Sequence, residues 1–163
     1  MAEIWDAYDK DFNRIDGVKL IRGEPVPDGI YHLVCDVIVK HTDGTYLLMM
    51  RDPRKHFGGM WELTAGGSAL AGETPEECAA RELLEETGIT AAELQEIRRI
   101  AHDGHRSYYV EFLCITDTDK DVVTLQEGET VDYRWVDKAS ILSMSENEHA
   151  SSRALAILRE TDI

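Results

Sequence analysis

A short helix with strong signals at both ends constrains this chain more than any other feature. Thr74 suits the N-cap, Pro75 suits the first helical position, and Glu77 completes a capping box. Gly88 is a natural C-terminal stop for the same segment. The sequence therefore predicts a helix over residues 75–87.

The predicted helix divides into two sides at 3.6 residues per turn. The side that we expect to pack on a sheet comprises Ala80, Leu83, Leu84 and Thr87, and the solvent side carries Glu82, Glu85 and Glu86. Carboxylates at the spacing i, i+3, i+4 are neighbours that repel one another, and a divalent cation reverses that interaction. Mg²⁺ prefers oxygen ligands. The spacing is thus typical of a metal site, and a solvated glutamate-rich face is the alternative.

The wider frame around the acids decides between these alternatives. Gly67 is followed after five residues by Glu73 and then after seven by Arg81 and the segment ELLEETGI. The whole stretch GSALAGETPEECAARELLEETGI, residues 67–89, resembles the Nudix box at every defining position. A chance match is on the order of 10⁻¹⁰ per start position at ordinary residue usage. The resemblance extends more loosely over residues 30–140 and implies the Nudix fold, an α/β/α sandwich around a mixed β-sheet.

The resemblance also implies roles for individual residues, carried over position by position. Glu85 and Glu86 match the principal metal ligands, and Glu82 matches a residue that supports metal binding or water activation. Arg81 matches the arginine that positions this glutamate, and Glu73 matches an auxiliary acid near the metals. The backbone carbonyl of Gly66 matches a frequent metal ligand, while Gly67 and Gly88 match turn glycines. Many members have proline where this chain has Ala65.

A second resemblance is to the branch of the superfamily close to isopentenyl-diphosphate isomerase. It is carried by WDAYD, YHLVCDVIV and WELTAGGSALAGE. The isomerase pattern has a catalytic cysteine and a metal-binding histidine, and those positions look like Ala65 and Gly67 here. The isomerase sequence also departs from the Nudix-box pattern, whereas the pattern is intact in this chain. The resemblance therefore implies an isomerase-like frame carrying hydrolase chemistry.

The remaining sequence mixes strands and helices, which predicts an α/β or α+β class with one sheet covered by helices. Residues 1–30 indicate short peripheral strands, with turns at Asp16-Gly17 and at residues 25–29. Further strands are predicted at 31–40, 45–51, 61–64, 93–102, 107–116 and 130–136, with Gly66-Gly67 breaking the third of them. A short helix is expected at 137–143, and a last helix is expected to open at Ser145.

Several residues outside the box are candidates for substrate binding. Arg51, Arg54 and Lys55 form a basic cluster before the box, suited to phosphate not held by metal, with a solvated loop as the alternative. Glu127 and Glu129 lie in a loop from which many Nudix hydrolases draw a further ligand or base. For two other residues, Glu111 and His32, a structural role is the favoured interpretation.

Those two positions are Glu111 and His32. Glu111 lies mid-strand between apolar residues. It is a candidate to face the site, but an exposed strand face is the favoured interpretation. His32 begins a buried strand and is interpreted as a structural histidine rather than a metal ligand.

The composition bounds the remaining possibilities. The 163 residues are expected to form a single domain. The net charge of −15, from 32 acidic and 17 basic residues, argues against binding to a nucleic-acid polymer. The three cysteines have no zinc or disulfide spacing, which favours a reducing cytoplasm. We find no signal-peptide pattern and no apolar run of membrane-spanning length, so no membrane partner is expected.

Together these features predict a Mg²⁺-dependent hydrolase, with Mn²⁺ as an alternative ion, that cleaves a diphosphate linkage in a nucleoside-diphosphate derivative. The expected substrate is a small molecule such as a nucleotide sugar or a nucleoside di- or triphosphate, and a homodimer is left open. One alternative is an isomerase of allylic diphosphates, against which the missing cysteine counts. Another is a non-catalytic nucleotide-binding regulatory domain, against which the intact acidic triplet counts.

Overall fold

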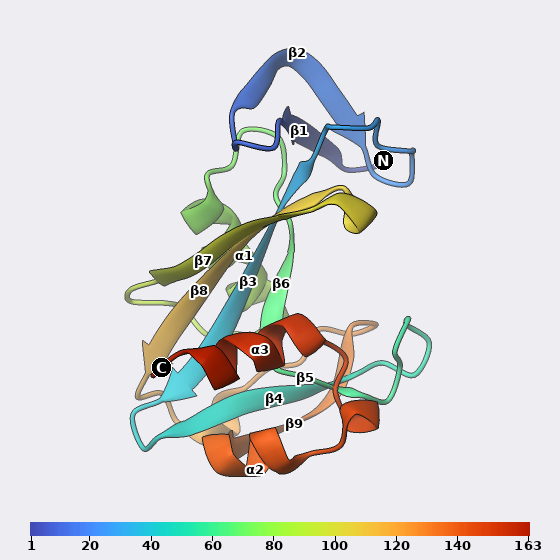
Figure 1. Cartoon of the computed structure of the whole chain (residues 1–163). Helices are drawn as coiled ribbons and strands as arrows, with labels where there is room; N and C mark the ends of the chain where they lie inside the picture. The colour runs from blue at the N-terminus through green and yellow to red at the C-terminus, as the bar shows by residue number, and fades with distance from the viewer.

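A mixed seven-stranded sheet forms the centre of the molecule in the computed structural model, which describes all residues from 1 to 163 (Figure 1). Its strands are β3 (His32–His41), β4 (Thr45–Arg51), β5 (Trp61–Glu62), β6 (Thr64–Ser68), β7 (Gln95–His102), β8 (Ser107–Thr116) and β9 (Thr130–Asp137). Strands β3 and β8 pair in parallel, and the other pairings are antiparallel. The strands expected over 107–116 and 130–136 are therefore confirmed to within one residue.

The sheet forks at the hairpin between β3 and β4. These two strands pair only near Lys40 and Tyr46. Beyond that point β3 takes β6 as its partner, while β4 pairs with β9 and β5. The fork matters because the two diverging branches leave space between them that side chains from both branches line.

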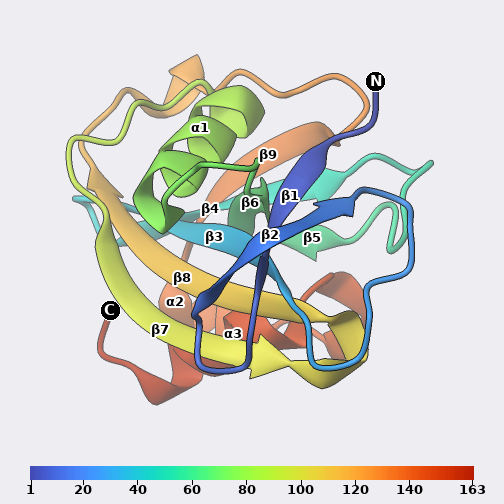
Figure 2. The same ribbon diagram turned by 90° about the horizontal axis from the view of Figure 1, so that it is seen from above.

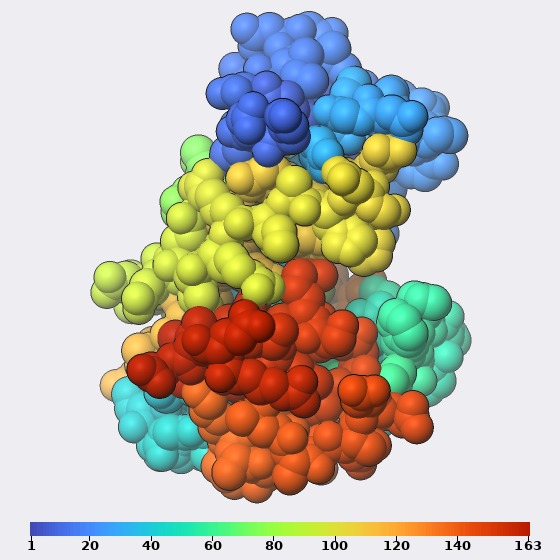
Figure 3. Space-filling view, in the orientation of Figure 1, coloured from blue at the N-terminus to red at the C-terminus, as the bar shows by residue number.

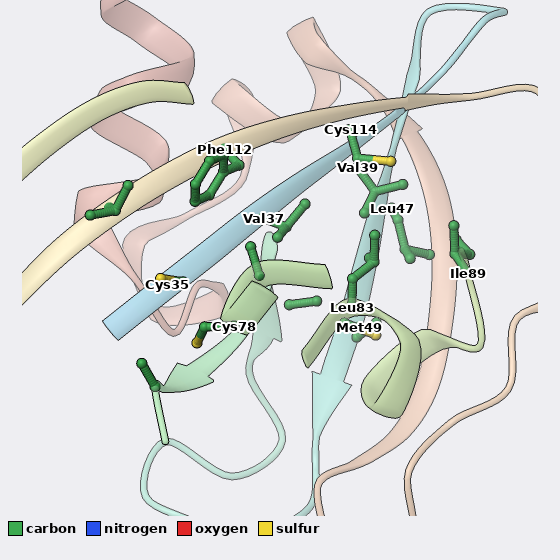
Figure 4. Close-up of a cluster of buried hydrophobic side chains, with 14 of the residues drawn as sticks. Cys35, Val37, Val39, Leu47, Met49, Cys78, Leu83, Ile89, Phe112 and Cys114 are labelled. Atoms are coloured by element: carbon green, nitrogen blue, oxygen red, sulfur yellow. The ribbon is translucent and has the colours of Figure 1, made fainter. Parts of the chain in front are cut away.

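Helices cover both faces of the sheet, which confirms the expected α/β/α sandwich. Helix α1 (Pro75–Thr87) packs over one face, where Leu83 and Cys78 join Val37 and Phe112 in the larger core (Figure 4). Helices α2 (Lys138–Ser143) and α3 (Ser152–Glu160) pack over the other face (Figure 2). No helix is both long enough and apolar enough to cross a membrane.

Helix α1 begins and ends where the sequence predicts, but its buried face differs from the expectation. The capping box between Thr74 and Glu77 is present, and Gly88 adopts the left-handed conformation at φ 75°. The residues buried against the sheet are Cys78, Ala79, Leu83 and Thr87, whereas Ala80 and Leu84 are exposed. The prediction that all three box glutamates face solvent was also wrong, because Glu82 and Glu86 lean toward β6 and only Glu85 is exposed.

The glycine pair Gly66-Gly67 does not break a strand, as the sequence suggested, but lies within β6. Gly66 pairs with Asp36, and Gly67 pairs with Cys35 across the β3–β6 ladder. A Cβ atom at Gly66 would lie 2.2 Å from the carbonyl oxygen of Cys35. The glycines therefore permit a close approach of groups to β6 rather than a turn.

Two expectations at the chain ends needed correction. The N-terminal strands β1 (Ile4–Tyr8) and β2 (Arg14–Ile21) do form a hairpin, but its turn lies at 9–13. Gly17 lies inside β2 with φ at 76°, next to an irregularity in the β1–β2 register. The last helix begins at Ser152 rather than Ser145, since Ser145 caps a separate 3₁₀ turn over Glu146–Glu148.

The N-terminal hairpin forms a separate unit beside the central sheet. It has its own small core of Trp5, Ala7 and Leu20. It is held to the box loop by hydrogen bonds from the Ala71 N–H to the Ile4 carbonyl (2.8 Å) and from the Gly72 N–H to the Asp6 carboxylate (2.7 Å). In the space-filling view the hairpin (blue) forms one end of the molecule, and α3 (red) lies on the front face nearer the other end (Figure 3).

We predict that Gly66→Ala lowers the free energy of unfolding by about 1–3 kcal/mol or more, because the added methyl group meets the β3 backbone. Chemical denaturation monitored by circular dichroism measures the change. Gly67→Ala is the matched control. Its Cβ would meet the Glu82 side chain, which can move, at 2.6 Å. Equal stability of the Gly66 variant and the wild type would contradict this account of β6.

Candidate functional site

A cleft in the fork of the sheet brings the box helix together with distant parts of the chain. It consists of two adjoining cavities of about 440 Å³ and about 240 Å³. The larger lies beside α1 and is bordered by the N-terminal hairpin, and the smaller extends between the two branches of the sheet. The residues that line both are Lys55, Gly66, Glu86 and Glu129.

Arg81 organises the acidic residues of the larger cavity. Its guanidinium donates to both carboxylate oxygens of Glu73, at 2.5 and 2.9 Å. It also donates to Glu82 at 2.8 Å and to Glu85 at 3.3 Å. The hydrogen bonds to Glu73 and Glu82 hold the pKa of Arg81 above its usual range. Arg81 is therefore placed to fix the positions of the glutamates around it.

Glu73 occupies a supporting position in this arrangement. In addition to Arg81, its carboxylate accepts a hydrogen bond from the Leu70 N–H at 2.8 Å. It does not line the cleft. The geometry thus places Glu73 behind Arg81, in contrast to Glu82, Glu85 and Glu86, which line the larger cavity.

Glu82 lies against the backbone of β6 because the strand has no side chain there. A Cβ atom at Gly67 would be 2.6 Å from one oxygen of Glu82. Burial raises the pKa of Glu82, and the hydrogen bond from Arg81 opposes that rise. Glycine at this position lets a carboxylate from the helix reach the strand.

Among the acids of the cleft, Glu86 has the fewest groups that offset its negative charge. Its carboxylate accepts a hydrogen bond from the Gly66 N–H at 3.3 Å, and no arginine or lysine forms an ion pair with it. Burial raises its pKa to about 8, and the nearby acids Glu82, Asp36 and Glu62 act in the same direction. A group in this environment favours either a proton or a cation beside it.

The donor set fits a hard divalent cation. Carboxylate oxygens from Glu82, Glu85 and Glu86 line one cavity with the backbone of Gly66, and oxygen ligands are those that Mg²⁺ prefers. In the present side-chain positions no three acidic, histidine or cysteine side chains converge closely enough to enclose an ion. Two of these carboxylates, Glu82 and Glu85, are instead paired with Arg81.

The residues expected to bind substrate divide into two groups. Arg51 and Lys55 line the smaller cavity, and Lys55 forms an ion pair with Glu129. Arg54 instead donates to Asp52 at 2.6 Å and lies outside both cavities, and Glu127 is exposed outside them as well. The structure therefore brings three of these five residues to the cleft.

Glu111 contradicts the favoured interpretation of an exposed strand face. It is only 2% exposed and lies between two arginines, accepting from Arg98 at 2.9 Å and from Arg153 at 2.7 Å. Arg153 also donates to buried Asp36, which lines the smaller cavity. Sequence reasoning missed this network, because its members come from β3, β7, β8 and α3. A charged residue inside each apolar strand was the available signal.

The N-terminal hairpin supplies a second set of residues that the sequence did not indicate. Glu3, Trp5 and Arg22 border the larger cavity. Trp5 stacks on His32 with ring centroids 4.3 Å apart, and Nδ1 of His32 lies 3.0 Å from the carbonyl oxygen of Arg106. His32 thus has the surroundings of a structural histidine, and it supports the hairpin wall.

Comparisons with known proteins show which family this chain resembles. The family model described as the NUDIX domain matches residues 30–156. The chain is 31% identical over 140 residues to an uncharacterised Nudix hydrolase of Listeria monocytogenes, covering 85% of this chain and 82% of that protein. It is 33% identical over 97 residues to an 8-oxo-dGTP diphosphatase of Proteus vulgaris, covering 59% of this chain and 80% of that protein.

Solved structures show the same fold. A crystal structure of a Deinococcus radiodurans protein superposes with a TM-score of 0.79 at 16% identity, covering 99% of this chain and 100% of that one. The coverage includes the N-terminal hairpin, which lies outside the residues that the family model matches. The hairpin is therefore an addition that this chain shares with at least one solved structure.

The raised pKa of Glu86 predicts a pH dependence of stability in metal-free protein. The folded state binds the Glu86 proton more tightly than the unfolded chain, so this contribution is present at low pH. It is lost as the pH rises toward about 8. We expect the Tm of the wild type in EDTA to fall between pH 6.5 and 8.5 more steeply than that of Glu86→Gln. Parallel Tm profiles of the two proteins would refute the assigned environment.

Proposed function

The chain belongs to the Nudix hydrolase family, and on that basis we propose that it is a Mg²⁺-dependent hydrolase, with Mn²⁺ as an alternative ion, that cleaves a diphosphate linkage in a nucleoside-diphosphate derivative. The observation that carries this proposal is the uncompensated carboxylate of Glu86, set beside Glu82 and Glu85 in an open cleft. The same cavity is also lined by Arg22 and Lys55, which suit phosphate oxygens.

The residues divide the work of the reaction as follows. Glu86 and Glu85 would hold the cation, with the carbonyl of Gly66 as a further oxygen donor. When bound, it would supply positive charge that neutralises the diphosphate and the negative charge that develops on its oxygens. Glu82, fixed by Arg81 at 2.8 Å, accepts the proton of the attacking water. Arg51 and Lys55 orient the phosphate on the far side.

Glu73 acts as a positioning residue in this scheme. Its two hydrogen bonds to Arg81 fix the guanidinium, and the guanidinium fixes Glu82. This role differs from that of an auxiliary ligand, because both Glu73 oxygens are already engaged by protein donors. The expected consequence of losing Glu73 is a displaced Arg81 rather than a lost ligand.

The isomerase alternative lacks a residue that its chemistry needs. Ala65, at the position that looks like the isomerase cysteine, is buried on β6, and its methyl group can neither give nor take a proton. The Cys35 and Cys78 thiols lie in the core. Hydrogen bonding with the Cys78 thiol, together with burial, holds the pKa of Cys35 well above its usual range, which opposes thiolate formation. Hydrolysis is therefore the reaction that the site supports.

A panel of nucleotides with Mg²⁺ tests the proposal. Nucleotide sugars and nucleoside di- and triphosphates are incubated in ¹⁸O-labelled water, and the phosphate products are analysed by mass spectrometry. We expect label in one phosphate product. Exchange of carbon-bound hydrogen on isopentenyl diphosphate, with no hydrolysis across the panel, would instead establish the isomerase alternative.

Substitution of the proposed ligands should abolish most activity without unfolding the protein. We predict that Glu85→Gln and Glu86→Gln each lower kcat by about 10²-fold or more, through loss of a few kcal/mol of charge stabilisation. Glu76→Gln is the matched control, because Glu76 is an exposed acid on the first turn of the same helix. Wild-type kcat in the Glu86 variant at saturating Mg²⁺ would remove it from the site.

Metal binding has a readout that is independent of activity. A ligand that binds only the folded state stabilises it by mass action. We predict that millimolar Mg²⁺ or Mn²⁺ raises the Tm of the EDTA-treated wild type, and that Glu86→Gln reduces this shift. An identical Tm shift in both proteins would place the ion elsewhere, and no shift in either would argue against a preformed site.

A further inference from the structure

The loop that joins β6 to α1, residues 69–74, is held from two sides. On one side Arg81, which lines the larger cavity, donates to the Glu73 carboxylate at 2.5 and 2.9 Å and to the Ser68 carbonyl at 3.2 Å. On the other side lies the N-terminal hairpin (Figure 1). The position of this loop therefore depends on a part of the chain that is remote from the box in sequence.

The hairpin supplies two acceptors to N–H groups of the loop. The Ile4 carbonyl accepts from the Ala71 N–H at 2.8 Å, and the Asp6 carboxylate accepts from the Gly72 N–H at 2.7 Å. Asp6 and Gly72 are 66 residues apart in the sequence, and Asp6 lies outside the residues that the family model matches. The first contact joins backbone groups, whereas the second requires a side-chain acceptor. The second contact therefore depends on which residue occupies position 6.

Asp6 is a buried charge with both carboxylate oxygens in use. It is only 4% exposed, and one oxygen accepts from Lys19 of β2 while the other accepts from the Gly72 N–H. Burial alone would raise the pKa of Asp6, but these two hydrogen bonds outweigh it, and the pKa lies below its usual range. A buried carboxylate without partners would be costly. The ionised side chain is therefore fixed between the hairpin and the loop.

The constraint on Gly72 reaches the acidic site because the next residue is Glu73. The Glu73 carboxylate holds the Arg81 guanidinium, which donates to Glu82 at 2.8 Å. Glu82 is the residue proposed to accept the proton of the attacking water. A displaced loop would thus move Glu73 first, then Arg81, and through Arg81 the carboxylate of Glu82.

We propose that Asp6 is a positioning residue for the hydrolysis, which holds the Gly72 N–H and thereby keeps Glu73, Arg81 and Glu82 in their places. The inference rests on the proposed hydrolase function and adds to it a residue from outside the region that the family model matches. It gives the N-terminal hairpin a part in the reaction. The alternative is that Asp6 serves only the stability of the hairpin, through its ion pair with Lys19.

Amide hydrogen exchange tests the contact without substrate or metal. Asp6→Ala removes the acceptor of the Gly72 N–H. We expect the amide hydrogens of Ala71 and Gly72 to exchange about tenfold faster or more in this variant than in the wild type, because the loop opens more readily. Asp6→Asn keeps an oxygen acceptor and should retain most of the protection. Equal exchange in Asp6→Ala and the wild type would overturn the proposal.

Steady-state kinetics tests whether the loop controls the reaction. We expect Asp6→Ala to lower kcat about tenfold while KM changes less than about twofold, because a misplaced group slows the chemical step and the phosphate-binding residues Arg51 and Lys55 are untouched. Asp6→Asn should recover most of the lost kcat. A fall of the same size in both variants would assign the effect to the charge of Asp6 and would overturn positioning through the Gly72 N–H.

The substitution Lys19→Gln separates positioning from hairpin stability. It removes the ion partner of Asp6 within the hairpin and leaves the acceptor of the Gly72 N–H in place. Loop exchange and kcat should therefore stay at wild-type values, whatever the change in Tm. The exposed acid Asp16 on β2 gives the matched control Asp16→Ala, for which exchange and kcat should also be unchanged. If Lys19→Gln lowers kcat as much as Asp6→Ala does, hairpin stability alone sets the activity and the positioning role is wrong.

Failure of this inference is distinguishable from failure of the proposed function. If the wild type hydrolyses no nucleotide of the panel, the hydrolase function fails and the positioning role fails with it, even where exchange shows that Asp6 holds the loop. If the wild type is active and Asp6→Ala exchanges faster but keeps wild-type kcat, the positioning role is wrong and the hydrolase function stands.

Discussion

The approach of two helix carboxylates to a strand without side chains is the contact on which the site depends. The Glu82 carboxylate lies 2.6 Å from the place that a Cβ at Gly67 would occupy, and the Glu86 carboxylate accepts a hydrogen bond from the Gly66 N–H. Three acids on one helix face repel one another, which destabilises the helix. Packing of Leu83 and Cys78 into the core holds the helix down, so the acids are kept close together and only partly hydrated. The repulsion between these carboxylates therefore persists in the folded protein, and a bound cation would reduce it.

The charges around the cleft are arranged to limit that repulsion without removing it. Arg81 compensates Glu73 and Glu82, and Lys55 compensates Glu129, but Glu86 at the junction of the two cavities receives no cation from the protein. A chain with a net charge of −15 could not neutralise every acid in any case. Because Glu86 is the cleft carboxylate that has no cationic partner, its surroundings are the most favourable place in the cleft for a bound cation.

Local signals predicted the box helix and failed where long-range packing decides. The caps of α1 depend on residues 74, 77 and 88, which are close in sequence, so the bounds of the helix could be derived. The orientation of the helix could not be derived. In the sequence alone Gly66 and Gly67 look like strand breakers, because the pairing of their strand with β3 is a long-range contact. The same limit hid Glu111. A carboxylate within an apolar strand is buried only if arginines arrive from elsewhere, and Arg98 and Arg153 come from β7 and α3.

This difference explains why the chain's reaction class was easier to infer than its substrate. The groups proposed to react lie within residues 66–86, on one strand and one helix joined by a short loop, so a motif in the sequence carries them together. The smaller cavity is assembled from β3, β4, β5, β6, β9 and the segment that leads into α3. It exists because β3 and β4 pair only at Lys40 and Tyr46, next to their connecting turn, and then diverge to leave a fork that the chain's last helix closes. A substrate pocket built in this way can change with any one of its walls, while the helix and strand that hold the acids stay as they are.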